Sequence, residues 1–458
     1  MAINGKLSAK KIIICESLFI SAGLMTIGLL LSKFLGFLRE VLIAKVFGVS
    51  YLCDAYLVAI LFPISVMGAI SQSMGVSLIP LFSKKDFSKY HLALFINTFF
   101  SLFFSFLIAL FPQGIINIVG QGFPLNVKET AKILLRNMAP AVFLIGVSGF
   151  FNAFSYVNKN YFFPALSGIL YNIGLILGIT YLYRLFSLSG LAFSVNLASF
   201  LYILLPLAFF LKREKAVRDF KEISQKEVFY FLKFLFLNFL PYLLVSSVSQ
   251  INVTIDRAIA SFLEEGSISA LNFAYKIVEL PLGIFGFAFA TVLMPYFSEK
   301  FYNGEKEQMI KQTNNFLSLL SLIILPITLA FILLNEQIIR IVYFRGAFNE
   351  KALIMTKEAL TFYSLGLLAY CANLILIRLF WSIGEIKLPI IISGASVLLN
   401  LLLDLILAKF LSYKGLALAT SLSGIFRLLL FTFSLSYHFQ WRLRLVNWKE
   451  IFNGKYGG

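Results

Sequence analysis

Long apolar stretches separated by short polar breaks run through the whole chain. A helix needs about 20 mostly apolar residues to cross the hydrocarbon core of a bilayer. By that measure the pattern predicts an all-α polytopic membrane protein with about twelve transmembrane helices. The expected spans are 14–46, 53–82, 91–118, 129–156, 162–184, 188–211, 228–257, 267–297, 310–343, 352–382, 387–409 and 414–437.

Composition supports a membrane protein and excludes several kinds of chemistry. The chain is 59% hydrophobic and 13% charged, whereas soluble domains carry about 25% charged residues. Its three cysteines and two histidines are scattered, so neither a disulfide framework nor a transition-metal site is expected. The sequence has no GxxxxGK(S/T) phosphate loop. We therefore expect that the chain uses no nucleotide cofactor and is not an enzyme.

Positive charge is distributed unevenly between the two sides of the predicted membrane. The chain has 39 Lys and Arg against 22 Asp and Glu, and most of the basic residues fall in alternate loops, starting with the N-terminus. Cytoplasmic loops of membrane proteins carry an excess of Lys and Arg. Both termini are therefore predicted to be cytoplasmic. The net charge of +17 is explained by this topology and by membrane lipids, and no nucleic-acid partner is expected.

Matching motifs on either side of a basic stretch indicate an internal repeat. Pro164 and Pro389 open two of the predicted spans, and Gly-Leu-Ala sequences at Gly190 and Gly415 follow at the same offset. Two six-helix halves of like orientation around a central cavity are a layout typical of transporters. The predicted organisation is an N-terminal half at 1–211, a basic cytoplasmic linker at 212–227, a C-terminal half at 228–437 and an amphipathic basic tail at 438–458.

A charge pair, Arg39 and Glu40, stands in the middle of an apolar run. A charge inside a bilayer costs about 3 kcal/mol or more, so such residues usually serve a substrate or ion pathway. Asp256 and Arg257 repeat the pattern in the seventh predicted span. A structural pair at a contact between helices is the other interpretation of Arg39 and Glu40, and both remain open from the residues alone.

Three stretches resemble the MurJ (MviN) family of lipid II flippases, in the multidrug/oligosaccharidyl-lipid/polysaccharide (MOP) exporter superfamily. They are SKFLGFLREVLIAKVFG at 32–48, DRAIASFLEEGSISALNFAYKIVELPLGIFGFAFATVLMPYFSEK at 256–300 and YFRGAFNEKA at 343–352. The resemblance implies a protein of the bacterial inner membrane. It also implies translocation of an undecaprenyl-pyrophosphate-linked peptidoglycan precursor, lipid II, from the cytoplasmic to the outer leaflet. Alternating access coupled to an ion or to the membrane potential is the implied mechanism.

The same resemblance implies a substrate site for the pyrophosphate. Arg39 fits this role because its planar guanidinium can bind two phosphate oxygens at once. Lys276 is the second expected cation, with Glu279 on the same helix face, three residues on. Glu40 either positions Arg39 or forms a gate pair with it. The expected substrate-binding set is Arg39, Glu40, Lys276, Ser32, Lys33 and Glu279.

A second group of residues predicts an ion site. Asn400 and Asp404 are four residues apart in one predicted span, and Leu416 and Thr420 are four apart in the next, so each pair shares a helix face. With Asp256 they offer carboxylate, amide, hydroxyl and backbone carbonyl oxygens, which suit a hard cation. Some MurJ-like proteins carry a sodium site in these helices, so the resemblance implies Na⁺ or a proton here.

Several departures from the family pattern keep alternatives open. Met67 stands where the family has a substrate arginine, and Arg257 or Arg427 could neutralise the two aspartates without any ion. Many members also have two further spans after the twelfth. The alternatives are a flippase for another polyisoprenoid-linked oligosaccharide, a cation-coupled small-molecule antiporter and a membrane scaffold. Nothing in the sequence specifies the oligomeric state.

Overall fold

The computed structural model describes residues 28, 30–83, 88–213 and 225–438, and every regular element in these ranges is a helix. By its internal contacts the chain divides into two compact units. Unit 1 comprises Met1–Ile43, Ala55–Gly120 and Pro124–Gln250. Unit 2 comprises the short segments Ala44–Asp54 and Gln121–Phe123 together with Ile251–Gly458.

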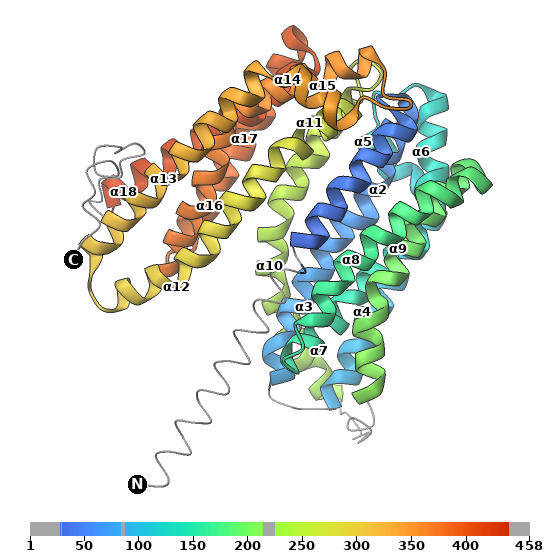
Figure 1. Ribbon diagram of the computed structural model, residues 1–458. Helices are drawn as coiled ribbons and strands as arrows, with labels where there is room; N and C mark the ends of the chain where they lie inside the picture. Colours follow the sequence, from blue (N-terminus) through green and yellow to red (C-terminus); the bar gives the residue numbers. More distant parts are fainter. Residues whose placement is uncertain (1–27, 29, 84–87, 214–224, 439–458) are drawn as a thin grey trace, which may run out of the picture. The chain divides into compact units, whose positions relative to one another are not determined.

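Unit 1 is built from the helices of the first half of the chain, coloured blue to green in Figure 1. A helix at 30–47 begins the described part, and its last residues belong to unit 2, as do the first residues of α2 and the last residues of α10. The other elements are α2 (Tyr51–Ile60), η1 (Leu61–Val66), α3 (Met67–Ser83), α4 (Ser88–Leu110), α5 (Pro112–Val119), α6 (Leu125–Asn137), α7 (Ala139–Val157), α8 (Phe162–Leu177), η2 (Gly178–Leu182), α9 (Tyr183–Arg213) and α10 (Gln225–Ala260).

Unit 2 holds the helices of the second half, coloured yellow to red in Figure 1. Its largest helix pairing joins α17 and α18. The elements are α11 (Ser267–Pro281), η4 (Leu282–Phe287), α12 (Ala288–Tyr302), α13 (Lys306–Leu333), α14 (Asn335–Tyr343), α15 (Glu350–Ser364), α16 (Leu367–Ser382), α17 (Lys387–Leu411) and α18 (Tyr413–His438).

The prediction of an all-α membrane protein is confirmed. Eight helices in the described ranges are long and apolar enough to cross a bilayer, and nine if α15 and α16, bent by 47°, form one span. The count of twelve stays a prediction. So does the division at the 212–227 linker, because residues 214–224 lie outside the described part, as do the first residues of the expected span 14–46 and nearly all of the tail at 438–458.

Four expected spans were wrong as continuous helices. The range 91–118 is broken at Phe111 between α4 and α5, the range 129–156 at Met138 between α6 and α7, and the range 310–343 at Leu334 between α13 and α14. The range 352–382 is broken between α15 and α16, which are bent by 47°. Proline explains the first two breaks, because Pro112 and Pro140 lie in the first turn of the following helix, where a missing N–H costs nothing. Apolar length alone does not register such breaks.

The internal repeat is visible in the backbone of two helical hairpins. Ser187, between the η2 segment and the main part of α9, and Ser412, between α17 and α18, both have a positive φ, 48° and 53°. They are separated by the same number of residues as Gly190 and Gly415. A Cβ at Gly190 would lie 2.0 Å from the Leu182 carbonyl oxygen, and one at Gly415 would lie 2.3 Å from that of Leu407. Both glycines are therefore required by the same tight turn.

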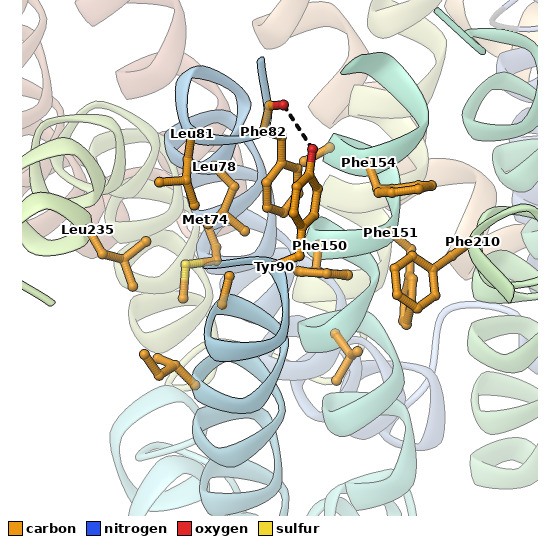
Figure 2. Packing of buried hydrophobic residues seen from close by; sticks show 14 of the residues in the cluster. Met74, Leu78, Leu81, Phe82, Tyr90, Phe150, Phe151, Phe154, Phe210 and Leu235 are labelled. Atoms are coloured by element: carbon orange, nitrogen blue, oxygen red, sulfur yellow. Dashed lines mark hydrogen bonds between the residues drawn. The ribbon is translucent and has the colours of Figure 1, made fainter. Parts of the chain in front are cut away.

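Aromatic side chains fill the core of unit 1, as Figure 2 shows. Phe82 of α3 stacks on Tyr90 of α4 with ring centroids 4.2 Å apart, and the Tyr90 hydroxyl donates to the Phe82 carbonyl oxygen at 2.8 Å. Phe150 of α7 packs edge-on against Phe82 at 5.3 Å. The bulk of these rings holds α3, α4 and α7 together on one side, while small residues bring α3 and α7 close further along.

Gly149 marks that close approach, and its replacement tests it. Gly149→Ala is expected to cost about 1–3 kcal/mol of stability, because a Cβ there would lie 2.0 Å from the Ser71 carbonyl oxygen. Gly68→Ala is the control, since a Cβ at Gly68 meets no atom within 4 Å and alanine favours a helix. Thermal unfolding in detergent, followed by size-exclusion chromatography, measures both. Equal melting temperatures would contradict the packing.

Candidate functional site

Arg39 is held by side chains of two neighbouring helices in unit 1. It lies in the helix at 30–47, and its guanidinium donates to Glu40 Oε1 at 2.5 Å and to Asn172 Oδ1 at 3.0 Å. The Glu40 side chain is 4% exposed and that of Arg39 is 19% exposed. A guanidinium has five N–H donors, so these two bonds leave further donors for a ligand.

Asn172 of α8 organises this cluster and was missed in the sequence. Its Nδ2 donates to the carbonyl oxygens of Ser32 at 2.9 Å and of Gly168 at 3.0 Å, while its Oδ1 accepts from Arg39. Ser32 therefore joins the cluster mainly through its backbone, and Lys33 is exposed beside it. An amide in a long apolar run is the signal that could have identified Asn172, because buried polar groups in a membrane need partners.

Lys276 and Glu279 form an ion pair on α11 in unit 2. Lys276 Nζ lies 2.7 Å from Glu279 Oε2, and the two side chains are 29% and 46% exposed. The predicted sharing of one helix face is thus confirmed. The Arg39 cluster belongs to unit 1 and this pair to unit 2.

Met67 is buried and does not face an open space in which a cation could bind. It is 2% exposed at the start of α3. A Cβ placed on Gly146 of α7 would lie 2.3 Å from the Met67 methyl carbon. The side chain therefore fills the contact between α3 and α7, where an arginine would be buried.

The residues of the predicted ion site are brought together in unit 2. Asn400 Nδ2 donates to Asp404 Oδ2 at 2.5 Å and to Asp256 Oδ1 at 3.2 Å. Thr420 Oγ1 donates to the Leu416 carbonyl oxygen at 3.0 Å. One amide thus links two carboxylates from α10 and α17.

Ser423 completes the connection to α18 and is a second residue that sequence reasoning missed. Its hydroxyl lies 2.9 Å from Asn400 Oδ1 and 2.9 Å from the Thr420 carbonyl oxygen. Asp404 is fully buried, and its Oδ1 has no hydrogen-bond partner in the described structure. Arg427, one alternative partner for the aspartates, instead donates to Ser393 Oγ. Arg257, the other alternative, lies close enough to Asp256 to interact with it electrostatically.

The chemistry of this group suits a hard cation better than a transition metal. No group of three or more His, Cys, Asp or Glu side chains that could hold a metal occurs in the described ranges. Two carboxylates with amide, hydroxyl and backbone oxygens remain, and such ligands suit a hard cation. The orphaned oxygen of Asp404 fits a bound cation or a proton, because an unpaired buried carboxylate is costly.

Asp54 is a further buried acid that the sequence reasoning did not single out. It is 2% exposed, and its carboxylate accepts from the backbone N–H groups of Gly266 at 2.9 Å and Ser269 at 2.8 Å. These groups are at the N-terminus of α11, the helix of Lys276, which has no side-chain cap of its own. Asp54 therefore caps α11 from a distant part of the chain and complements its helix dipole.

Loss of this cap should loosen the start of α11. Asp54→Ala is expected to raise hydrogen–deuterium exchange at residues 266–269 about tenfold or more, because charge-assisted bonds to a helix N-terminus contribute about 1–3 kcal/mol. Asp54→Asn keeps one acceptor oxygen and should show a smaller increase. Glu350→Ala, an exposed acid in the first turn of α15, is the control. Unchanged exchange in Asp54→Ala would contradict the capping role.

Known proteins similar to this chain agree with one another. The family model described as "Lipid II flippase MurJ" matches residues 43–451. A probable lipid II flippase MurJ of Thermotoga maritima is 30% identical over 406 residues, which covers 87% of this chain and 82% of that protein. The lipid II flippase MurJ of Thermosipho africanus is 31% identical over 425 residues, covering 91% and 86%.

Solved structures extend the likeness to the fold. A structure of lipid II flippase MurJ in an inward closed conformation has a TM-score of 0.79 at 30% identity, covering 90% of this chain and 87% of that one. A MATE family transporter of the MOP superfamily, at 12% identity, has a TM-score of 0.75 over 88% and 93% of the two chains and shows the shared fold alone. Because the family model spans most of its length, the chain belongs to the MurJ family.

Proposed function

We propose that this chain is a flippase that carries lipid II from the cytoplasmic to the outer leaflet of the bacterial inner membrane. Its relatives carry that name, and its helices are long and apolar enough to cross a bilayer. The lipid tail of such a substrate can stay in hydrocarbon, whereas the pyrophosphate and sugars cannot cross without polar partners. The protein therefore works by binding and by changing conformation between the two sides, with both termini in the cytoplasm.

The proposal depends mainly on Arg39, whose guanidinium keeps hydrogen-bond donors available for a ligand. A cation within a membrane protein is expensive, and its partners Glu40 and Asn172 hold it without using all its donors. Pyrophosphate oxygens are the ligands that a guanidinium fork binds best. Lys276, the second expected cation, is a point charge in unit 2, where it pairs with Glu279.

The coupling ion in this proposal is sodium, with a proton as its competitor for the same carboxylates. A bound Na⁺ or proton would offset one of the two negative charges of Asp256 and Asp404, which Asn400 holds close together. Comparison with the first half of the chain indicates that these polar residues serve a function. At the offset set by Gly190 and Gly415, the positions of Asn400, Asp404, Thr420 and Ser423 correspond to Leu175, Ile179, Val195 and Ala198, all buried and apolar.

The first copy of the hairpin thus forms with apolar residues at these four positions. The four polar residues of the second copy therefore serve something other than packing. Replacing both partners of a buried hydrogen bond by apolar groups of the same shape can be nearly neutral or stabilising. Selection for an ion is the simplest reason to keep a fully buried aspartate with an unpaired oxygen in α17.

Complementation of a bacterium depleted of its own flippase tests the substrate. The wild-type chain should restore lipid II exposure on the outer leaflet, and Arg39→Ala should reduce it tenfold or more, since a lost charged hydrogen bond contributes about 1.5–3 kcal/mol. Arg39→Lys should give an intermediate level because a point charge replaces a bidentate fork.

The control is Arg345→Ala at equal expression. Arg345 is exposed, and its guanidinium bonds to the carbonyl oxygens of Ile341 and Val342 in its own turn. Rescue by wild type, by Arg345→Ala and by Arg39→Ala alike would remove Arg39 from the mechanism. No rescue by correctly inserted wild-type protein would reject lipid II as the substrate.

Sodium should stabilise the purified protein through the predicted ion site. At 100 times the dissociation constant a bound ion adds about 2.7 kcal/mol, so the melting temperature should rise with NaCl but not with KCl. Asp404→Asn and Thr420→Val should abolish the rise, and Glu350→Gln should keep it. A sodium effect that survives Asp404→Asn would place the ion elsewhere.

A further inference from the structure

Unit 1 contains a cavity of about 420 Å³ among α3, α7, α8 and α9. This volume lies in the range of small-molecule sites, about 300–1,000 Å³, and is far larger than one water needs. It exists within the unit, so it does not depend on how the two units are arranged. Gly68, whose added Cβ would meet no atom within 4 Å, forms part of its wall.

The lining of this cavity is uncharged and mostly apolar, with polar groups among its residues. Its described wall includes three tyrosines, Tyr156, Tyr171 and Tyr202, while the remaining hydrogen-bonding groups are amides and hydroxyls. The rings of Tyr171 and Tyr202 lie at right angles, with centroids 6.2 Å apart. No Asp, Glu, Lys, Arg or His is among the lining residues of the described structure. The amide and hydroxyl groups belong to Ser71, Gln72, Ser148 and Asn152.

Two buried polar atoms on the wall have no partner. Asn152 donates through Nδ2 to the Tyr202 hydroxyl at 3.4 Å, but its Oδ1 accepts nothing in the described structure. The hydroxyl of Tyr171, a side chain that is 9% exposed, is also without a partner there. Each such group costs about 1–3 kcal/mol when left unsatisfied, so a ligand that reached either atom would supply a hydrogen bond that the described structure does not.

The cavity adjoins the Arg39 cluster. Tyr171 on its wall precedes Asn172, the residue that accepts a hydrogen bond from Arg39. Arg39 and Glu40 are also close enough to the Tyr171 phenol to interact with it electrostatically. A ligand that places an anion at Arg39 can therefore extend a neutral part toward Tyr171.

We propose that this cavity binds the neutral N-acetylated sugar next to the pyrophosphate of the carried lipid, while Arg39 binds the pyrophosphate. The inference rests on the proposed function and adds the part of the substrate that unit 1 selects. Sugar rings present apolar C–H faces that pack on aromatic rings, and hydroxyl and acetamido groups that pair with amides and hydroxyls. A cationic or anionic ligand would find no opposite charge on this wall.

The assignment also accounts for Met67. This residue fills the contact between α3 and α7 just before Gly68 on the cavity wall. An arginine in its place would put a charge beside a neutral site. Binding of the sugar thus depends on shape and neutral hydrogen bonds, and binding of the pyrophosphate on Arg39.

Three lipid probes test whether the cavity binds the sugar while Arg39 binds the pyrophosphate. Their binding to the purified chain in nanodiscs is measured by native mass spectrometry. The probes are undecaprenyl pyrophosphate without sugar, with one N-acetylated sugar and with two. Gly68→Leu, which fills the cavity, should weaken both sugar-bearing lipids about tenfold or more, the scale of one or two lost hydrogen bonds. It should leave the sugar-free lipid unchanged. Arg39→Ala should weaken all three.

Gly394→Leu on α17 is the matched control, because a Cβ there also meets no atom within 4 Å. Melting temperatures check that each variant is folded, and Asn152→Leu serves as a second variant of the cavity wall. Equal weakening of all three lipids by Gly68→Leu, or no weakening of any, would overturn the sugar site while the proposed function stands.

If the wild-type protein binds none of the three lipids, the proposed function is rejected instead. Ligand-detected NMR with a free N-acetylglucosamine disaccharide still decides about the cavity in that case. Saturation transfer that is present in wild type and Gly394→Leu but lost in Gly68→Leu supports the site. Its absence in wild type, or its persistence in Gly68→Leu, overturns it.

Discussion

A bilayer offers no water to pair with polar groups, so each charge or amide within this protein needs a partner from the chain itself. Arg39 meets that demand with Glu40 beside it and Asn172 across from it. Asp54 meets it with the backbone N–H groups that begin α11. These contacts join segments that are far apart in sequence, so the groups that serve function also fix which helices are neighbours.

The repeat shows how little of this chemistry the scaffold itself requires. Ser187 and Ser412 make the same unusual turn, and the glycines that follow them approach the same backbone carbonyl in each copy. The interiors nevertheless differ, because Leu175 and Ile179 occupy the places that Asn400 and Asp404 take in the second copy. Duplication thus preserved the backbone, where a Cβ would clash, and left the side chains in the hairpin free to become polar.

The sequence predicted features that depend on apolar length or helical spacing, and it did not predict features that depend on contacts between distant residues. Apolar length predicted the membrane helices, and spacing of four placed Asn400 beside Asp404 and Thr420 beside the Leu416 carbonyl. The breaks at Phe111 and at Leu334 were missed, because hydropathy does not register a change of helix. Asn172, Asp54 and Ser423 were missed for another reason. An amide in an apolar run marks Asn172 as a candidate, but the partners that define all three roles lie more than twenty positions away, beyond any local pattern.

The pairing of Arg39 with Glu40 has a consequence for selectivity. Without substrate the pair is nearly neutral, which lowers the cost of keeping a cation inside the membrane. A pyrophosphate must then compete with a carboxylate already 2.5 Å from the guanidinium, and at an effective dielectric constant of 20 that attraction is worth about 4 kcal/mol at 4 Å. Free phosphate has no second group with which to offset this competition. A lipid whose sugar also fills the neutral cavity beside Tyr171 does, so the acid next to Arg39 favours the complete head group over the anion alone.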